Sequence, residues 1–226
     1  MTTKSVEVEP LLRLLADGRT TDDLRAYFGV DRAPGEVPAY TGGRFERLAD
    51  GGDAGEVADH FTADDLVAVT TLGVRVPARA ALGLLEGPLG TALSELLRHV
   101  PRDVDLGDPE AEPALAARSA ADRAWRLLEQ QHDIGWVTSG KLLARKRPRL
   151  IPVYDQVVRC VLGSPERVWM ELHRAFRASD RALPTQLERL HTDAGLDSSI
   201  GLLRVLDVAL WMRHHDDHRR GSCGLV

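Results

Sequence analysis

Apolar residues recur every three or four positions along most of this chain, which is the spacing of α-helices with one buried face. Leu66, Val69 and Leu72, for example, fall on one side of such a helix. Only residues 150–153 resemble a strand, and they are too few for a sheet. The pattern therefore predicts an all-α fold, with a short helix opened by Gly135 and further helices over residues 10–17, 20–28, 62–72, 78–86, 91–100, 119–131, 156–162, 164–176, 185–191 and 200–213.

Short polar residues and glycines predict where several of these helices begin and end. Thr62 and Ser119 are each followed by an acid in the first turn, as at a capped N-terminus. Ser164 is followed by a proline that suits the first helical position, and a serine pair at 198–199 precedes the final helix. Gly29 predicts the end of the second helix.

Two segments indicate how the chain is organised. The final helix, residues 200–213, is apolar on almost every side, which predicts that it is buried. Residues 101–113 hold three prolines and five acids instead. That composition is typical of a surface linker, so we expect a subdomain boundary there.

The overall composition is that of a soluble globular protein, with 226 residues, 43% hydrophobic and 28% charged. No apolar run is long enough to span a bilayer, and the N-terminus lacks the apolar core of a signal peptide. We therefore expect a cytoplasmic protein without a membrane partner. Two cysteines are too few for a four-thiolate metal site, and we expect no cofactor. Arginines far outnumber the three lysines, which indicates a GC-rich genome such as that of an actinobacterium.

Basic residues are concentrated in one stretch. The chain carries a net charge of −5, yet residues 141–159 contain six basic residues and one acid. A basic patch on an acidic body is typical of a local anion contact. Alternatively, the cluster is a solvated turn, or it pairs with the protein's own acids. The first interpretation predicts that DNA or a nucleotide-like anion binds through residues 141–149, at Lys141, Arg145, Lys146, Arg147 and Arg149.

The turn before this patch has the chemistry of a phosphate site. Ile134, Gly135, Trp136 and Thr138 lie where a glycine-bounded turn opens a helix, and the first N–H groups of a helix can hold a phosphate. Trp136 at the tip would either wedge beside a nucleic-acid strand or pack on the next helix.

The residues after the patch carry an acid and an aromatic ring. Asp155 begins a helix, where a carboxylate could stabilise an oxocarbenium-like cation or position water. The same residue could be only an N-cap, which is favourable by about 0.5–2 kcal/mol. Tyr154 would either stack on a base in a substrate pocket or close the core.

Residues 132–139, His-Asp-Ile-Gly-Trp-Val-Thr-Ser, resemble the turn of helix-hairpin-helix proteins, whose usual form is Leu-Pro-Gly-Val-Gly-x-x-Thr-Ala. Downstream, Val153, Asp155 and Val158 resemble the acid motif of base-excision DNA glycosylases in that superfamily. Asp133 replaces the first glycine of the hairpin. Val137 stands where bifunctional members have a Schiff-base lysine, so the resemblance implies a monofunctional enzyme.

The glycosylase resemblance also implies a fold and an active site. The chain would be a single helical domain, 1–226, with one lobe from residues 1–100 plus 200–213 and a second from 114–198. Asp155 would be the catalytic acid, and the hairpin would grip a phosphate.

The whole chain also resembles an uncharacterised actinobacterial family built on a domain of unknown function. Residues 145–152, Arg-Lys-Arg-Pro-Arg-Leu-Ile-Pro, and residues 207–212, Asp-Val-Ala-Leu-Trp-Met, match strings typical of it. That family has no activity to transfer.

Two functional hypotheses are consistent with these patterns. The first is an N-glycosylase-type hydrolase that acts on DNA or a nucleoside derivative through Asp155. The second is a non-catalytic module on the same scaffold that binds nucleic acid, a nucleotide or a protein. We predict no metal site, although residues 214–218, His-His-Asp-Asp-His, leave that question open. The substrate and the oligomeric state do not follow from the sequence.

Overall fold

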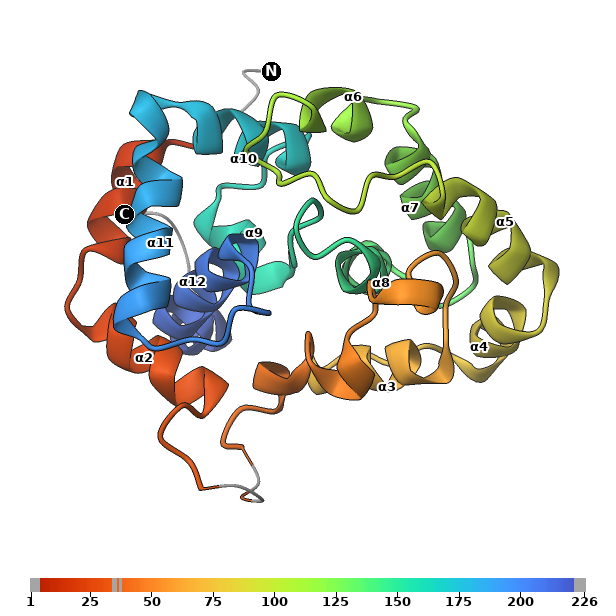
Figure 1. Ribbon diagram of the computed structural model, residues 1–226, viewed down its shortest axis with the longest axis horizontal. Coiled ribbons are helices and arrows are strands. Elements are labelled where there is room, and N and C mark those ends of the chain that lie inside the picture. The colour runs from red at the N-terminus through yellow and green to blue at the C-terminus, as the bar shows by residue number, and fades with distance from the viewer. Residues whose placement is uncertain (1–4, 34–35, 37, 222–226) are drawn as a thin grey trace.

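The computed structural model describes residues 5–33, 36 and 38–221, and over these residues the fold is all-α, without a strand. In Figure 1, α8 (Trp136–Lys146), α9 (Gln156–Val161) and α12 (Leu202–Arg219) lie inside a ring formed by the other helices. In the described residues, three short 3-10 helices lie between α2 and α3, namely η1 (Thr41–Arg44), η2 (Leu48–Asp50) and η3 (Gly55–Val57), and a fourth, η4 (Ser179–Arg181), lies between α10 and α11. The α-helices are α1 (Val8–Leu15), α2 (Arg19–Phe28), α3 (Ala63–Thr71), α4 (Ala78–Leu85), α5 (Pro88–Leu97), α6 (Ala111–Leu115), α7 (Ala120–Glu129), α8 (Trp136–Lys146), α9 (Gln156–Val161), α10 (Val168–Arg177), α11 (Ala182–Asp193) and α12 (Leu202–Arg219).

Three predicted helix ends are confirmed by their local geometry. Thr62 and Asp65 form a reciprocal capping box at the start of α3. The Ser119 side chain accepts a hydrogen bond from the backbone N–H of Asp122 at the start of α7. Gly29 ends α2 in the left-handed conformation. These signals work because cap and helix lie within three or four residues of each other.

Two predicted N-terminal caps are wrong. Ser164 adopts a positive φ of 57° inside a turn, and α10 begins only at Val168 with Arg167 as its N-cap. The final helix begins after Gly201, and no side chain caps it. This helix also continues past residue 213 to Arg219, and in this extension the His215 ring stacks on Trp211 one turn earlier, with the ring centres 4.3 Å apart.

The acidic segment 101–113 is not simply a surface linker. Leu106 and Ala111 are buried, and the backbone N–H of Leu106 donates to the carbonyl of Arg149 at 2.9 Å. Residues 150–153 form no strand. The backbone N–H groups of Leu150 and Ile151 instead close a turn on the carbonyl of Arg147.

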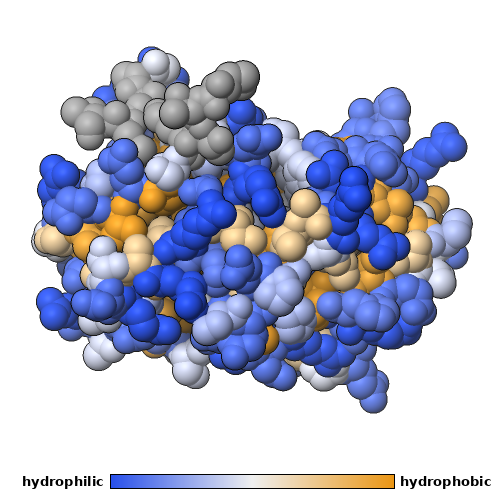
Figure 2. All heavy atoms as spheres, turned by 90° about the horizontal axis from the view of Figure 1, so that it is seen from above, coloured by the Kyte–Doolittle hydropathy of each residue, from blue (hydrophilic) through white to orange (hydrophobic). Residues whose placement is uncertain are grey.

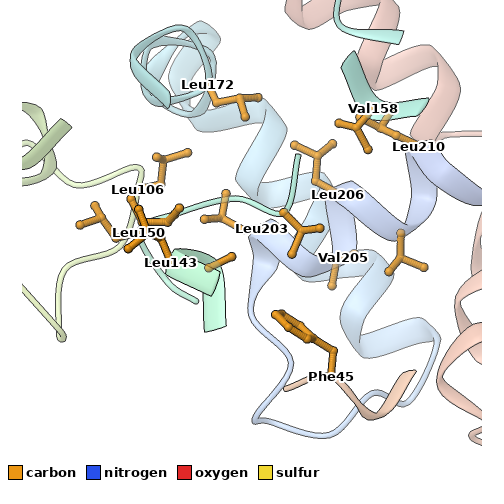
Figure 3. Packing of buried hydrophobic residues seen from close by; sticks show 14 of the residues in the cluster. Phe45, Leu106, Leu143, Leu150, Val158, Leu172, Leu203, Val205, Leu206 and Leu210 are labelled. Carbon is orange, nitrogen blue, oxygen red and sulfur yellow. The ribbon is translucent and has the colours of Figure 1, made fainter. Parts of the chain in front are cut away.

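Helix α12 forms the centre of the core, as its sequence predicts. Val205, Val208 and Leu210 are fully buried, and the helix packs against α2, α9 and α11. Figure 3 shows Leu206 and Leu210 facing Val158 of α9. No helix in the described part of the chain is long and apolar enough to cross a membrane. On the face in Figure 2, hydrophilic residues predominate and apolar groups show between them.

Candidate functional site around the α7–α8 hairpin

A short turn, residues 130–135, connects α7 to α8. Ile134 is buried and anchors the turn to the core. Asp133 adopts a positive φ of 64°. Gly135 is the N-cap of α8, no side chain caps this helix start, and an added Cβ on Gly135 would meet no atom within 4 Å. The first N–H groups of α8 therefore have no capping side chain.

The basic cluster that follows does not form the surface patch expected for binding an anion. The side chains of Lys141, Arg145, Lys146 and Arg147 are all buried, with Lys146 0% and Arg147 2% exposed. Only Arg149 is substantially exposed, and its guanidinium forms an ion pair with Asp105 at 2.7 Å. The alternative interpretation, pairing with the protein's own acids, describes what the structure shows.

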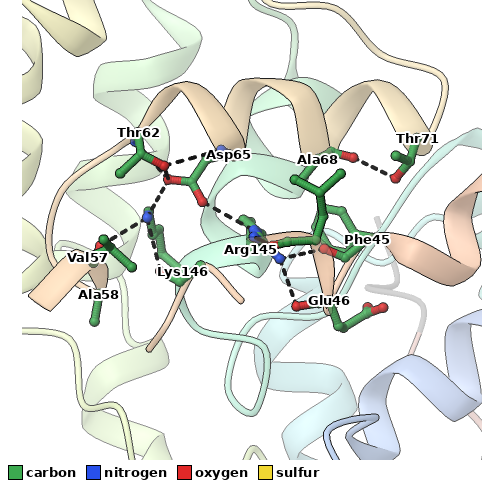
Figure 4. A network of polar contacts seen from close by, with 12 residues as sticks. Phe45, Glu46, Val57, Ala58, Thr62, Asp65, Ala68, Thr71, Arg145 and Lys146 are labelled. Carbon is green, nitrogen blue, oxygen red and sulfur yellow. Dashed lines mark hydrogen bonds and ion pairs between the residues drawn. The ribbon is translucent and has the colours of Figure 1, made fainter. Parts of the chain in front are cut away.

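Asp65 is the centre of this buried network (Figure 4). Its carboxylate lies 3.2 Å from Nε of Arg145 and forms a second ion pair with Lys146. The Lys146 ammonium also donates to the carbonyls of Gly52 and Val57, both at 3.0 Å. Burial lowers the pKa of Lys146, and Asp65 acts in the opposite direction. A buried charge is tolerated only when it is paired and hydrogen-bonded, so these contacts explain why the cluster lies inside.

Arg147 has a similar structural role. Its guanidinium donates to the carbonyls of Ala58 and Val100 at 2.7 and 2.8 Å, and to Asp59 at 2.6 Å. Arg147 and Lys146 together hold the η2–η3 region against the end of α8.

Both carboxylate oxygens of Asp155 contact neighbouring groups. Its Oδ1 accepts the N–H groups of Val157 and Val158 at 3.0 and 3.2 Å, which caps α9. Its Oδ2 lies 3.5 Å from the Lys141 ammonium, which also donates to the carbonyl of Leu72 at 2.9 Å. Burial lowers the pKa of Lys141, and Asp155 opposes that effect. Asp155 therefore acts as a helix cap and as the partner of a buried lysine, and its side chain is 17% exposed.

The two aromatic residues predicted for the site do come together. The rings of Trp136 and Tyr154 lie 5.4 Å apart, and the Arg159 guanidinium lies 5.3 Å from the Trp136 ring. Burial raises the pKa of Tyr154 to about 12. Both rings line a cavity of about 560 Å³.

Two further tryptophans line the same cavity, so that three of the four in the chain meet there. Trp125 comes from α7 and Trp169 from α10, and both are partly buried. Their helical spacing predicted core positions. Such a spacing identifies the inward face of a helix, and it cannot distinguish a packed core from a cavity wall. Arg159 and Arg167 add positive charge to the lining, which also contains acids. Thr138 is buried in α8 and does not line this cavity.

A second buried network connects α12 to the N-terminal part of the chain. Arg204 lies 2.7 Å from Glu46, donates to the Tyr27 hydroxyl at 2.7 Å, and forms an ion pair with Asp207. Burial raises the pKa of Asp207 to about 7, against the opposing charge of Arg204. Burial likewise raises the pKa of Glu46. The sequence carries no local signal for this network, whose members come from three distant segments.

Residues 214–218 extend α12, and His215 stacks on Trp211. Within the described residues, no three histidine, cysteine or acidic side chains converge so that they could hold a metal ion.

Comparison of the chain with curated proteins and with solved structures gives no match. Residues 20–214 do match the family DUF6308, which is described as a family of unknown function. This match covers most of the chain, including both buried networks and the aromatic cavity. The protein therefore belongs to the DUF6308 family.

Proposed function

We propose that this protein binds a small nucleotide-like ligand, with a planar aromatic ring and an anionic group, in the cavity lined by Trp125, Trp136, Tyr154 and Trp169. The observation that carries the proposal is the meeting of three of the four tryptophans in one cavity of about 560 Å³. This volume lies within the usual range for small-molecule sites.

The lining supplies both kinds of contact that such a ligand needs. Aromatic side chains stack on bases with little sequence preference, and each stack contributes about 1–3 kcal/mol. Arg159 and Arg167 also line the cavity, and guanidinium groups are suited to phosphate. Arg167 is exposed and lies in the lining of this cavity.

A small ligand fits the charge distribution better than a nucleic-acid strand does. A strand is held mainly through many phosphate contacts. Four of the five basic residues predicted for that purpose are buried against the protein's own acids and carbonyls, and the chain carries a net charge of −5. We therefore favour the second of the two functional hypotheses, in the form of a nucleotide-binding module.

Binding of the four ribonucleoside 5′-monophosphates, measured by isothermal titration calorimetry, tests this proposal. We expect at least one to bind saturably, and the corresponding nucleoside to bind more weakly because Arg159 and Arg167 lose their partner. Trp136→Leu should weaken binding at least tenfold, and Arg159→Gln should weaken the nucleotide more than the nucleoside.

Arg123→Gln changes an exposed arginine of α7 outside the cavity lining and serves as the matched control. Absence of binding by all four nucleotides, or equal binding by Trp136→Leu, would refute the proposal.

A second candidate is the N-glycosylase-type hydrolase, on a two-lobed scaffold like that of the helix-hairpin-helix glycosylases. Asp155 is the candidate acid: it is the N-cap of α9 and directly follows Tyr154, which lines the cavity, although Asp155 itself is outside the lining. Release of free base from any bound nucleotide or from DNA, lost in Asp155→Asn, would support catalysis. If the wild-type protein releases no base, the hydrolase is excluded for those substrates and the binding module remains.

A further inference from the structure

Gly140 lies in the wall of the aromatic cavity, in the interior of helix α8. Glycine is the least favourable residue in a helix interior apart from proline. Two common structural reasons for glycine are a positive φ and a close approach that a side chain would block. Neither applies at Gly140. Its backbone is helical, and an added Cβ would have no atom within 4 Å apart from its two chain neighbours and the backbone of its own helix.

Other glycines of the chain show what a steric requirement looks like. At Gly90, inside α5, an added Cβ would collide with the carbonyl of Leu84. At Gly52 it would lie 2.6 Å from the carbonyl of Arg145. At Gly140 the corresponding volume is empty, although the residue itself is buried and lines the cavity. This empty volume therefore belongs to the cavity, and a ligand there can approach the bare backbone of α8.

Aromatic rings flank the bare part of α8. Trp136 lies four residues before Gly140, which puts both on the same face of the helix. The rings of Trp136 and Tyr154 touch, with centres 5.4 Å apart, so no third ring fits between them. The Arg159 guanidinium lies 5.3 Å from the Trp136 ring. A ligand ring therefore has to lie beside this pair, and Gly140 leaves room for it there.

Two further rings of the cavity have no aromatic or cationic partner in the protein. Trp125 and Trp169 both line the cavity. Neither ring contacts another aromatic ring or a Lys or Arg cation among the described residues. A ligand ring that stacks on either of them displaces no such contact.

We infer that Gly140 makes the aromatic cavity specific for a flat ring, because its missing side chain lets the face of the ring approach the backbone of α8. The inference rests on the proposed function, since it concerns the same cavity, and it adds the shape of the ligand and the residue that selects it. A methyl group on Gly140 would occupy the space of the ring and would disturb no packing between segments. Gly140→Ala should therefore block the ligand while leaving the fold at least as stable as that of the wild type.

Calorimetric binding and urea unfolding of Gly140→Ala test the inference together. We expect the best-binding nucleoside 5′-monophosphate to bind at least tenfold more weakly than it binds the wild type, with an unfolding midpoint no lower than that of the wild type. The matched control is Gly83→Ala in α4, outside the cavity lining, where the new Cβ would lie 3.5 Å from Leu89, an ordinary contact distance. This control should be equally stable or more so and should bind as the wild type does.

A second pair of probes separates this inference from the nucleotide proposal and needs no variant. Naphthalene-2-sulfonate is a flat aromatic anion without base or sugar, and decahydronaphthalene-2-sulfonate is its puckered, saturated counterpart. The wild type should bind the flat probe at least tenfold more tightly than the puckered one, and Gly140→Ala should weaken binding of the flat probe at least tenfold. If the flat probe behaves in this way and no nucleotide binds, the nucleotide proposal fails and the inference stands.

Four results would overturn the inference. The first is that no flat ligand binds the wild type, and the second is that the puckered probe binds as tightly as the flat one. The third is that Gly140→Ala binds flat ligands as tightly as the wild type does. The fourth is that Gly140→Ala lowers the unfolding midpoint, because the volume beside Gly140 would then not be empty.

Discussion

Replacing Asp65 with asparagine should be one of the most damaging conservative substitutions in this protein. The change keeps the size of the side chain and removes its charge. The Asp65 side chain is 1% exposed and pairs with Arg145 and Lys146, whose side chains are equally buried. The substitution therefore leaves two buried cations without their shared carboxylate. Breaking a buried pair in this way costs about 3–5 kcal/mol.

That loss would be a large part of a typical unfolding free energy of about 5–15 kcal/mol. Urea unfolding followed by circular dichroism measures it directly. The matched control is Asp105→Asn, which removes an ion pair with Arg149 in which both side chains are about half exposed. Exposed pairs contribute about 0–1 kcal/mol.

A double-mutant cycle separates the charge effect from other effects. Lys146→Met removes one of the two cations, so Asp65→Asn should cost at least about 1 kcal/mol less in that background. The reasoning fails if Asp65→Asn lowers the unfolding free energy by no more than Asp105→Asn does. It also fails if the two substitutions are simply additive.

Three further predictions concern other contacts. Gly42→Ala should lower the unfolding free energy by about 1–3 kcal/mol, because the new Cβ would lie 2.0 Å from the Tyr27 hydroxyl. Urea unfolding should show a smaller loss when the same change is made in the Tyr27→Phe background. A Gly42→Ala variant as stable as the wild type would contradict the geometry. Because burial raises the pKa of Asp207 to about 7, the folded state binds its proton more tightly than the unfolded state, whose carboxyl has a pKa of about 4. The contribution of Asp207 to stability is therefore complete below about pH 4 and is lost as the pH rises towards about 7; Asp207→Asn should flatten the measured stability between these values, and an unchanged slope would count against this assignment. Asp155→Ala should lower the unfolding free energy by about 1–3 kcal/mol, because it removes the cap of α9 and the partner of Lys141. A loss below about 0.5 kcal/mol, the low end for a helix cap, would show that neither contact stabilises the fold.

The sequence alone indicated the helical fold and much of the aromatic part of the candidate site. Helical spacing and caps such as Thr62 depend on residues within one turn of each other, so they can be recognised locally. The sequence marked Trp136 and Tyr154 as site candidates and did not predict that their rings meet, and the spacing of Trp125 and Trp169 indicated the core. A helical period identifies the inward face of a helix, and it does not reveal whether that face meets packed side chains or a cavity.

Only the tertiary structure decided whether the basic cluster is exposed or buried. Its charge pattern was equally compatible with an exposed anion site and with internal pairing. The partner of Lys146, Asp65, lies in α3, and the Gly52 carbonyl that accepts from the same ammonium is 94 residues away in the chain. Charge depends on residue type, which the sequence states, whereas the free energy of a buried charge depends on the groups that folding brings around it. The sequence therefore determined that the cations were concentrated in one segment, and the fold determined that they stabilise the interior.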